Sequence, residues 1–453
     1  MNQSSNPQSP LQDLPDSQLV RVIGTRELTA SIINVTIASS IFVMPAMAAE
    51  GLGAAAPIAY VVCAGLMTLI ALCFAAAGSR VSLSGGLYAY IEVAFGGFAG
   101  FLGGFLYSLT ACLSVASVAT AFAGAIGVLW PPLGAGLPRA LVLVCLFAAL
   151  AVVNVRGIKT GIRLVEAITA AKLVPLLFLV VVGAWSMNPD FLRMSVPTVS
   201  QVGQVSIVLL FAFVGVEVAL TPSGEVRNSS KTVPQSILGA LAIATVIYLA
   251  VQTVAQGVLG PELPAYKDAP LAETARRMLG ESAKLFLLAG GTVSIFGYVA
   301  GDMLGTPRAL FALARDGMLP ARLANVHPRY RTPATAIVCY GVVVAALAIS
   351  SSFERLVIMA NVSALLLYLL CVAASYELQR RDVRMAGTPF NLSGGVLVQL
   401  LAAGGIIWLL AQATVREFTL AGIALGIASA YYLLRVRYFR TPSAFSSSHA
   451  QDR

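Results

Sequence analysis

Charged side chains are scarce in this sequence. Only 11% of its 453 residues are Asp, Glu, Lys or Arg, whereas 58% are hydrophobic. Soluble domains usually carry roughly 25% charged residues, and a soluble chain of this length has no means of burying so much apolar surface. We therefore predict that the protein lies in a bilayer, with membrane lipids around it.

Side chains for enzyme chemistry and for metal binding are also few. The two histidines lie in a loop (His327) and in a tail (His449), so no Ser-His-Asp or Cys-His set is expected. All six cysteines lie in apolar runs, and their spacing matches no metal or disulfide framework. The nucleotide-binding pattern G-x-x-x-x-G-K-[ST] is missing as well. We expect no enzyme activity, no metal, no cofactor and no ATP-driven pumping.

Long apolar runs are what the sequence has in abundance. A membrane-spanning helix needs about 20 largely apolar residues. Twelve runs qualify: residues 27–49, 54–77, 86–126, 138–154, 162–186, 204–222, 234–258, 285–312, 333–350, 356–376, 394–413 and 418–434. The third run is long enough to span with strong tilt and to project beyond the bilayer. The predicted fold class is an all-α polytopic membrane protein with twelve transmembrane helices.

Polar ends frame this membrane domain. Residues 1–25 are expected to form a disordered tail, residues 26–440 the twelve-helix membrane domain, and residues 441–453 a second tail. Most of the 29 Lys and Arg fall in loops on the side where both tails lie. By the positive-inside rule that side is cytosolic, so both termini are predicted inside a cell (inner, cytoplasmic) membrane. The spread of these basic residues over many short loops argues against a nucleic-acid partner.

Two apolar runs are interrupted in the same way. In NVTIASSIFVMPAMAAEG, the small residue Ala38 is followed seven positions later by Pro45. In FAFVGVEVALTPSGEV, Gly215 is followed seven positions later by Pro222, with Glu217 between them. One such stretch is as well explained by helix packing or a mild kink. Two in corresponding places, one with a buried glutamate, favour a binding site.

The positions of the breaks predict an internal repeat. They fall at the start of two five-helix halves, at about residues 27–186 and 204–376, and the first helix of each half crosses in the opposite direction. Paired interruptions in inverted repeats point to a transporter's binding site. A break frees N–H groups at one half-helix and C=O groups at the other. A carboxylate and an ammonium on one substrate satisfy both kinds of group.

Four stretches resemble the amino acid–polyamine–organocation (APC) transporters. SSIFVMP resembles the family's first-helix motif G-S-G-[IV]-F-x-x-P, and SGGLYAYIEVAFGGFAGFLGG its third-helix start. FAFVGVEVALTPSGEVRNSSKTVPQSI resembles its sixth helix and following loop, and PRALFALARDGMLPARLANVHPRYRTPATAI the segment after its eighth. The resemblance covers about residues 20–440. It implies a LeuT-type fold of two inverted repeats plus two extra helices at about 394–434.

The resemblance also implies a substrate site at the two breaks. Its candidate residues are Thr36, Ala38, Ser39, Ser40, Ile41, Phe211, Ala212 and Gly215. Ser39, Ser40 and Ile41 would meet a carboxylate, and the carbonyls of Thr36, Phe211 and Ala212 an amine. Phe211 matches an aromatic that closes over the substrate, although a core or lipid-facing role stays open. The family's G-S-G is Ala38-Ser39-Ser40 here, which adds a hydroxyl where glycine leaves bare backbone.

Three ionisable residues lie deep in apolar runs and are candidates for coupling: Lys172, Glu217 and Asp302. By resemblance, Lys172 takes the place of a sodium ion, either exchanging a proton or bracing the first helix as a permanent cation. Asp302 lies at a similar depth and either pairs with Lys172 or faces a water-filled cavity. Glu217 either ties backbone N–H groups across its break or titrates during transport.

These features predict a secondary transporter whose partner is a small amino acid substrate. A neutral one is favoured, carried by proton coupling or by exchange without sodium. The alternatives are a sensor with the same fold and no turnover, a carrier of cationic amino acids or polyamines, and a channel. Paired breaks disfavour the channel. Members of the resembled family include monomers and homodimers, and the sequence leaves the oligomeric state open.

Overall fold

The computed structural model describes residues 24–37, 40–81, 86–156, 162–217, 226, 229–315, 319–385, 389–390 and 394–438. Within these ranges the side chains of residues 162–172, 229–230, 312 and 436–438 are not described. The two predicted tails thus fall almost wholly outside the described residues, as do Ala38, Ser39 and Pro222.

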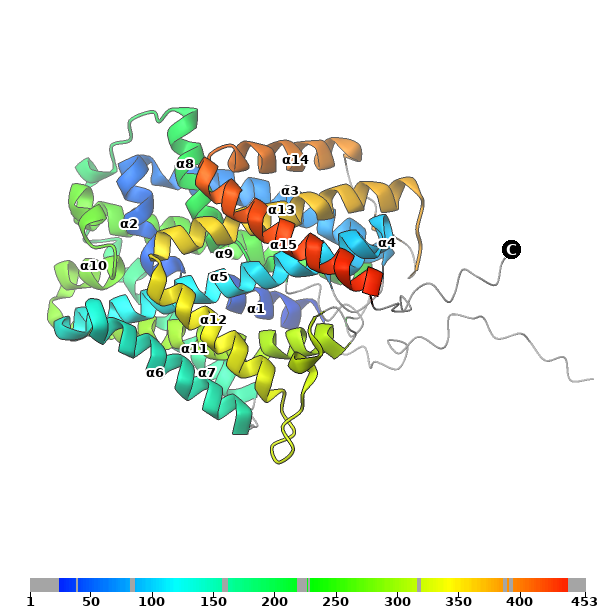
Figure 1. Ribbon diagram of the computed structural model, residues 1–453. Helices are drawn as coiled ribbons and strands as arrows, with labels where there is room; N and C mark the ends of the chain where they lie inside the picture. Colours follow the sequence, from blue (N-terminus) through cyan, green and yellow to red (C-terminus); the bar gives the residue numbers. More distant parts are fainter. Residues whose placement is uncertain are drawn as a thin grey trace, which may run out of the picture.

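Every regular element in these ranges is a helix, as predicted (Figure 1). The α-helices are α1 (Thr25–Thr36), α2 (Ser40–Leu52), α3 (Ala56–Arg80), α4 (Leu87–Phe95), α5 (Gly97–Leu129), α6 (Gly136–Arg156), α7 (Ile162–Gly183), α8 (Val199–Leu209), α9 (Ser229–Leu259), α10 (Pro270–Leu279), α11 (Glu281–Arg315), α12 (Ala334–Ser350), α13 (Phe353–Arg380), α14 (Val396–Leu410) and α15 (Val415–Tyr438). The 3-10 helices are η3 (Gly53–Ala55), η4 (Pro131–Leu133), η5 (Pro189–Leu192), η6 (Leu210–Ala212), η9 (Gly260–Ala265) and η10 (Ala321–Ala324).

Among the described residues, seven helical segments are long and apolar enough to cross a membrane. They are Ser40–Arg80, Gly97–Leu129, Gly136–Arg156, Lys231–Ala265, Glu281–Arg315, Phe353–Arg380 and Val415–Arg435. Shorter apolar helices occupy Leu173–Gly183, Val199–Ala212, Ala334–Ser350 and Val396–Leu410. Each of these segments overlaps a run predicted from the sequence. The chain is therefore a multi-pass membrane protein.

The outer faces of the peripheral helices are apolar. Leu137 and Leu141 on α6 are 72% and 53% exposed, and Ile423 and Ile427 on α15 are 54% and 67% exposed. Each such side chain left in water gives up about 1.5–3 kcal/mol of free energy that burial would contribute to folding. In hydrocarbon that loss vanishes, so these faces are suited to lipid and not to water.

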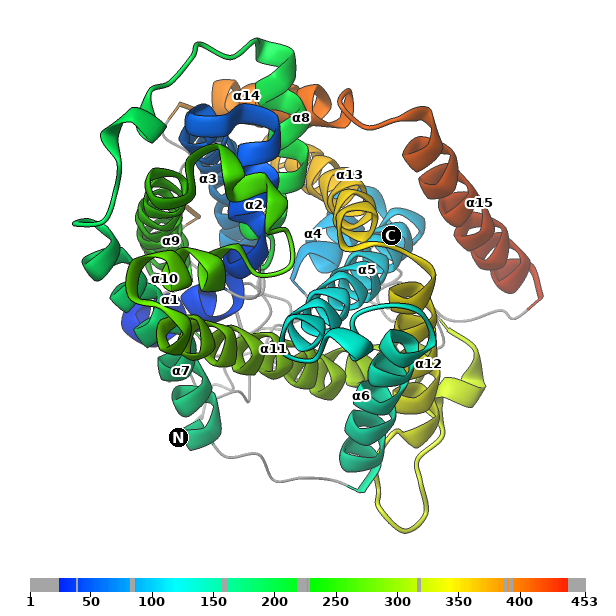
Figure 2. The same ribbon diagram turned by 90° about the vertical axis from the view of Figure 1, so that its left-hand side faces the viewer.

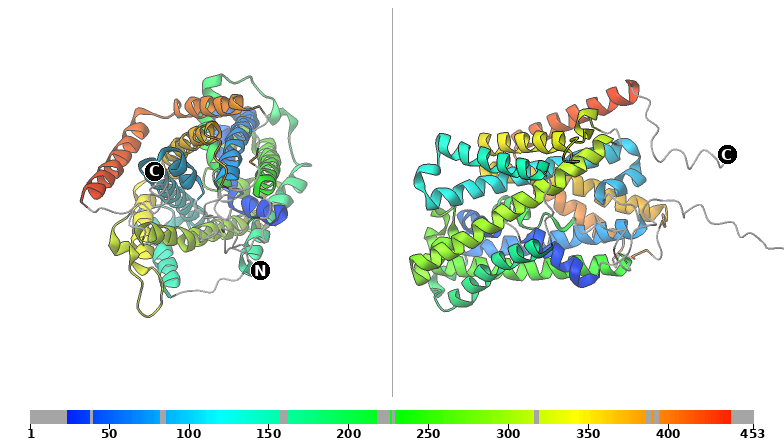
Figure 3. Two further views of the ribbon diagram at one scale, coloured as in Figure 1. Left: turned by 90° about the vertical axis from the view of Figure 1, so that its right-hand side faces the viewer. Right: turned by 90° about the horizontal axis from the view of Figure 1, so that it is seen from below.

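The long helices run roughly along one axis (Figure 1). We call the end where α1 begins and α15 ends the terminal end, and the opposite one the α10 end. Looking along the axis, α5 lies inside the bundle and packs against α4, α11, α12 and α13 (Figure 2). Helix α3 packs against α9, α13 and α14, while α15 rests at the periphery on α5 and α13 (Figure 3).

The third apolar run is not one continuous helix. It divides at Gly96 into α4 and α5, which differs from the single long tilted helix expected over residues 86–126. Gly96 has φ +89°, a conformation that side-chain-bearing residues rarely adopt. Past this turn α5 packs closely on α4, because Gly100 and Gly103 leave room for Glu92 and Ile91. The apolar pattern alone gives no sign of the turn.

Both predicted helix breaks are present. α1 ends at Thr36 and α2 begins at Ser40. The first break therefore ends five residues before Pro45, and this proline lies inside α2. The second follows η6, where residues 213–215 form a turn and Gly215 has φ +111°. The two breaks lie side by side: a Cβ on Gly215 would come within 2.8 Å of Val35 Cγ1.

A strap fastens α3 at the terminal end. The buried Arg80 guanidinium contacts Asp382 Oδ1 at 3.2 Å and donates to the Val383 carbonyl at 3.3 Å. The Met385 N–H donates to the Arg80 carbonyl at 2.9 Å. Arg384 and Arg80 together lower the pKa of the Asp382 carboxyl. The segment after α13 is thereby held across the end of α3.

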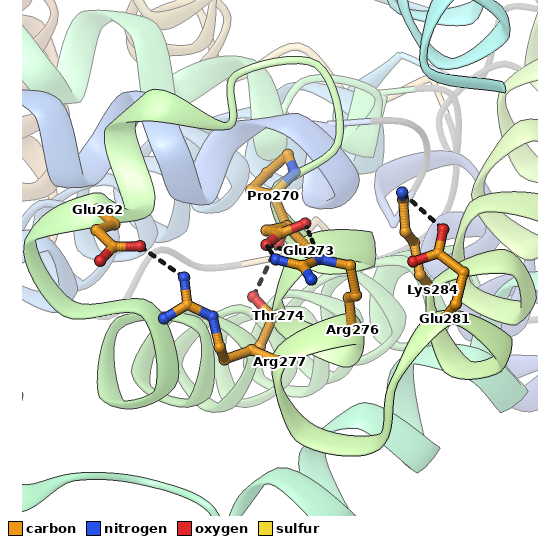
Figure 4. A network of polar contacts seen from close by, with 8 residues as sticks. All are labelled: Glu262, Pro270, Glu273, Thr274, Arg276, Arg277, Glu281 and Lys284. Carbon is orange, nitrogen blue, oxygen red and sulfur yellow. Dashed lines mark hydrogen bonds and ion pairs between the residues drawn. The ribbon is translucent and has the colours of Figure 1, made fainter. Parts of the chain in front are cut away.

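A cap of short helices covers the α10 end (Figure 4). η9 and α10 pack against α2. Ion pairs join Glu262 to Arg277 at 2.6 Å and Glu273 to Arg276 at 2.5 Å. The Arg276 guanidinium holds the pKa of the Glu273 carboxyl below its ordinary value of 4.5. The sequence analysis did not anticipate this cap, because α10 is too short and too polar to register as an apolar run.

Candidate functional site

One tyrosine joins the two breaks. The Tyr248 hydroxyl, on α9, lies 2.8 Å from the Thr36 carbonyl oxygen and 2.7 Å from the Ala212 carbonyl oxygen. These are the last residues of α1 and of η6, whose carbonyls lack helical partners because the helices stop there. A phenol carries a single hydrogen, so Tyr248 donates to only one of the two carbonyls at any moment.

The Tyr248 ring is fixed by packing. It is 1% exposed, and its centroid lies 5.3 Å from that of Phe213 and 5.9 Å from that of Tyr60. The Ser40 hydroxyl, at the first residue of α2, also hydrogen-bonds to the Tyr248 hydroxyl. Helix α9 therefore carries a rigid polar group into the gap between the half-helices, at the place where the sequence predicted an amine to bind.

A small cavity adjoins this junction. Its volume is about 20 Å³ and it is lined by Val35, Thr36, Ser40, Ser114, Val118, Phe211, Val214 and Tyr298. That space admits one water or slightly more. The hydroxyl oxygens of Thr36 and Ser114 are buried here without a hydrogen-bond partner. Burying an unsatisfied polar group costs about 1–3 kcal/mol, so these hydroxyls favour a polar occupant.

The cavity residue Phe211 packs against Phe353, whose neighbour in sequence, Glu354, lines a larger pocket. The Phe211 and Phe353 rings meet edge to face, with centroids 6.3 Å apart. Toward the α10 end lies a pocket of about 210 Å³, lined by Met47, Ala48, Glu50, Gly51, Gln201, Gln204, Val205, Val208, Leu209 and Glu354. Lys267 Nζ lies 2.6 Å from the Glu50 carboxylate at its rim.

Other side chains form hydrogen bonds with backbone groups at the second break. The Asn361 amide of α13 donates to the carbonyls of Ile207 and Val208 at 2.6 and 3.3 Å. The Glu217 carboxylate accepts the Gly215 N–H at 3.0 Å and the Tyr368 hydroxyl at 2.9 Å. Glu217 therefore ties a backbone N–H at the break to α13, one of the two roles predicted for it.

Asp302 lies apart from the cavity. Its carboxylate accepts hydrogen bonds from Thr306 at 2.7 Å and from Tyr340 at 2.5 Å. α11, which carries Asp302, packs against α7, which carries Lys172. The Lys172 side chain lies outside the described part of the chain, so its pairing with Asp302 stays a prediction. Within that part, no three His, Cys, Asp or Glu side chains gather as metal ligands would.

The structure gathers only some of the predicted site residues. Thr36, Ser40 and Phe211 line the cavity, whereas the Ala212 carbonyl contacts Tyr248 at the junction. Ile41 is buried in α2 and is not among the lining residues. The sequence analysis missed Ser114 and Val118 on α5, Tyr298 on α11 and Tyr248 on α9. Each is a single residue in an ordinary apolar helix, and no local pattern marks it.

The fold and the site together define a class of protein. Interrupted membrane helices that meet around a small buried cavity are the arrangement of a transporter for small solutes. The family model for amino acid permeases matches residues 23–432. The chain belongs to the amino acid permease family of APC transporters, as the motifs indicated.

Three relatives show the range of that family. An uncharacterised transporter of Mycobacterium tuberculosis is 31% identical over 372 residues, spanning 81% of this chain and 82% of the relative. The methylthioribose transporter of Bacillus subtilis is 26% identical over 412 residues, spanning 86% and 88%. The serine/threonine exchanger SteT of Bacillus subtilis is 26% identical over 443 residues, spanning 93% and 98%. All three are named as transporters and not as enzymes.

Proposed function

We propose that this permease is a secondary active transporter that moves small neutral amino acids across the cytoplasmic membrane by alternating access. The observation that carries the proposal is the meeting of the Thr36 and Ala212 carbonyls on one hydroxyl of Tyr248. An ammonium is a three-hydrogen donor with a full charge. It would bind the two carbonyls, while the α2 N-terminus at Ser40 would attract the carboxylate.

The lining of the inner cavity supports a neutral side chain. None of the eight residues that line it is charged, and Glu217 is not among them; its Oε2 accepts from both Gly215 and Tyr368. A cationic side chain buried there would lack a counter-ion, at a cost of several kcal/mol. The serine/threonine exchanger among the relatives carries substrates of this uncharged class. The volume of about 20 Å³ indicates that the cavity must widen before any amino acid enters.

Counterflow in proteoliposomes tests the function. Vesicles loaded with unlabelled serine, alanine, leucine or lysine are diluted into the labelled form of each. We expect accumulation with the neutral amino acids and little with lysine. Specific binding without counterflow would show a sensor, and counterflow with lysine or putrescine alone would show a cationic carrier; either result contradicts the proposal. Ser40→Trp should abolish both signals, because its indole fills the cavity.

Lys172 is assigned the coupling role in this proposal. An ammonium in mid-membrane must find partners or lose its proton, and α7 packs beside α11, the helix that bears Asp302. We expect uptake to need no sodium. We further expect Lys172→Ala to lose uptake while still binding substrate, because the substrate meets the helix breaks and not Lys172. Uptake is measured with sodium and proton gradients imposed separately. Strict sodium dependence, or full uptake by the variant, contradicts this role.

The orientation belongs to the same proposal. Twelve spans in a LeuT-type arrangement would put both termini in the cytosol. The terminal end would then face inward and the α10 end outward. The basic loops support this assignment, because the exposed arginines of residues 319–333 lie at the terminal end. The 210 Å³ pocket would be the external entrance.

A further inference from the structure

The segment between α11 and α12 forms a folded hairpin with its own hydrogen bonds. We call residues 319–333 the arginine hairpin. The His327 N–H donates to the Thr332 carbonyl at 2.8 Å, and the Arg331 N–H donates to the His327 carbonyl at 2.9 Å. His327 Nδ1 accepts from the N–H groups of Arg329 and Tyr330 at 3.2 and 3.3 Å. The imidazole thereby fixes the tip of the hairpin.

The hairpin is also tied to the bundle. The Thr332 hydroxyl donates to the Val155 carbonyl at 2.7 Å, next to Arg156 at the end of α6. Thr332 is 8% exposed, so this anchor is buried. The hairpin consequently keeps a fixed position beside α6, and its exposed side chains are presented in a defined place.

Charge on the hairpin has one sign. Arg322, Arg329 and Arg331 are exposed, and residues 319–333 contain no Asp or Glu. Arg156 beside the anchor is exposed as well. Within the described ranges none of these four guanidinium groups forms an ion pair, whereas Arg276, Arg277 and Arg380 elsewhere all do. These unpaired cations are available to an external anion.

The direction of the hairpin selects the partner. It projects sideways from the terminal end, beyond α6 and α12, and not along the helix axis (Figures 1 and 2). Because the helix axes follow the membrane normal, a sideways projection at a helix end lies at the depth of the lipid headgroups. Val326, which precedes His327, is 47% exposed. The ring of Tyr330, whose centroid lies 4.8 Å from that of His327, has the amphipathic character found at bilayer interfaces.

We propose that the arginine hairpin and Arg156 form a binding surface for the phosphate headgroups of anionic lipids. Guanidinium groups bind phosphate oxygens in a bidentate manner. Each basic residue near an anionic bilayer contributes about 1 kcal/mol, or roughly fivefold in affinity. The surface is independent of the transport site. The orientation proposed above decides only which leaflet supplies the lipid.

Native mass spectrometry of the full-length protein tests this surface. Phosphatidylglycerol and phosphatidylcholine are titrated onto the wild type and onto the triple variant Arg322→Gln/Arg329→Gln/Arg331→Gln. The matched control, Arg139→Gln/Arg355→Gln/Arg416→Gln, removes the same charge at the α10 end. We expect the hairpin variant to lose phosphatidylglycerol affinity on the order of a hundredfold and the control to lose little. Unchanged binding by the hairpin variant, or an equal loss in the control, overturns the proposal.

Two further variants test the folded presentation. His327→Ala removes the acceptor at Nδ1, while His327→Asn keeps a side-chain oxygen able to accept the N–H two residues on. We expect the alanine variant to bind phosphatidylglycerol several-fold more weakly and the asparagine variant to recover most of the affinity. Identical elution on size-exclusion columns confirms that the variants fold. Equal displacement of the lipid by millimolar inorganic phosphate, or hairpin-dependent binding of RNA in place of lipid, also overturns the proposal.

Discussion

At the scale of single residues, the site depends on groups that hold the ends of interrupted helices. The Tyr248 hydroxyl is the hydrogen-bond donor for the carbonyls of Thr36 and Ala212, and the Asn361 amide is the donor for those of Ile207 and Val208. Without such partners, freed backbone groups in a membrane cost several kcal/mol each. A substrate that enters must therefore replace a hydrogen bond that the empty protein already makes.

Tyr248→Phe should expose this exchange. Losing the hydroxyl leaves both carbonyls without their donor, which should lower the unfolding free energy by about 1–3 kcal/mol. A bound amino acid restores a donor, so we expect a larger substrate-induced rise in the midpoint temperature than in the wild type. Thermal unfolding with and without serine measures it. Tyr60→Phe, which removes a hydroxyl from the neighbouring ring, is the control. An unchanged substrate-induced shift would speak against the exchange.

At the scale of elements, local signals located the breaks but not what fills them. Small residues at Ala38 and Gly215, each followed seven positions later by a proline, marked the interruptions. The Tyr248 contact joins residues 212 positions apart in the chain. Only the packing of α9 against α1 brings them together. The sequence of α9 by itself does not indicate that Tyr248 contacts the end of α1. The turn at Gly96 was not predicted, because the sequence is equally apolar before and after this residue.

The cap helix α10 makes a pH-dependent contribution to stability. Its Glu273 side chain is 10% exposed and paired with Arg276, which lowers the pKa of Glu273 below 4.5. A carboxyl with a depressed folded-state pKa stabilises the fold above its ordinary pKa, and that stabilisation is lost as pH falls through the folded value. We expect the wild-type midpoint temperature to drop more steeply below about pH 4.5 than that of Glu273→Gln.

The more exposed pair on α11 supplies the control for this experiment. Glu281 is 61% exposed and contacts Lys284 at 2.8 Å. Surface pairs of this kind contribute little, so Glu281→Gln should keep the wild-type pH dependence. Differential scanning fluorimetry from pH 3.5 to 7 compares the three proteins. Parallel curves for the wild type and Glu273→Gln would show that the pair does not sense pH.

At the scale of the whole molecule, contacts join segments that are far apart in the sequence. The Phe211–Phe353 contact joins η6 to α13, and the Glu50–Lys267 ion pair joins α2 to the segment before α10. Composition predicted the membrane location and the length of the apolar runs predicted the helices, because apolar content reports the solvent. The contacts between distant segments were not predictable, because they depend on how packed helices are arranged and not on what each contains.

The direction of insertion can be tested by labelling. Lys267→Cys lies between η9 and α10, and Arg322→Cys lies on the arginine hairpin at the other end. With both termini in the cytosol, a membrane-impermeant maleimide added to intact cells should label position 267 and spare position 322. Permeabilised cells should label both. The wild type, with its own six cysteines, gives the background. Labelling of position 322 from outside would reverse the orientation.

The single hydrogen of the Tyr248 hydroxyl affects which solutes would compete well for the two carbonyls. Two acceptors share one donor in the empty protein, so one carbonyl is always short of a partner. A sugar hydroxyl that took the place of the Tyr248 hydroxyl would also offer one hydrogen and leave that shortage as it was. An ammonium offers three, together with a charge that both carbonyl dipoles favour. As the substrate site proposed above, the junction would sort solutes by the number of hydrogens that one group can donate there, and an amine would outrank a single hydroxyl.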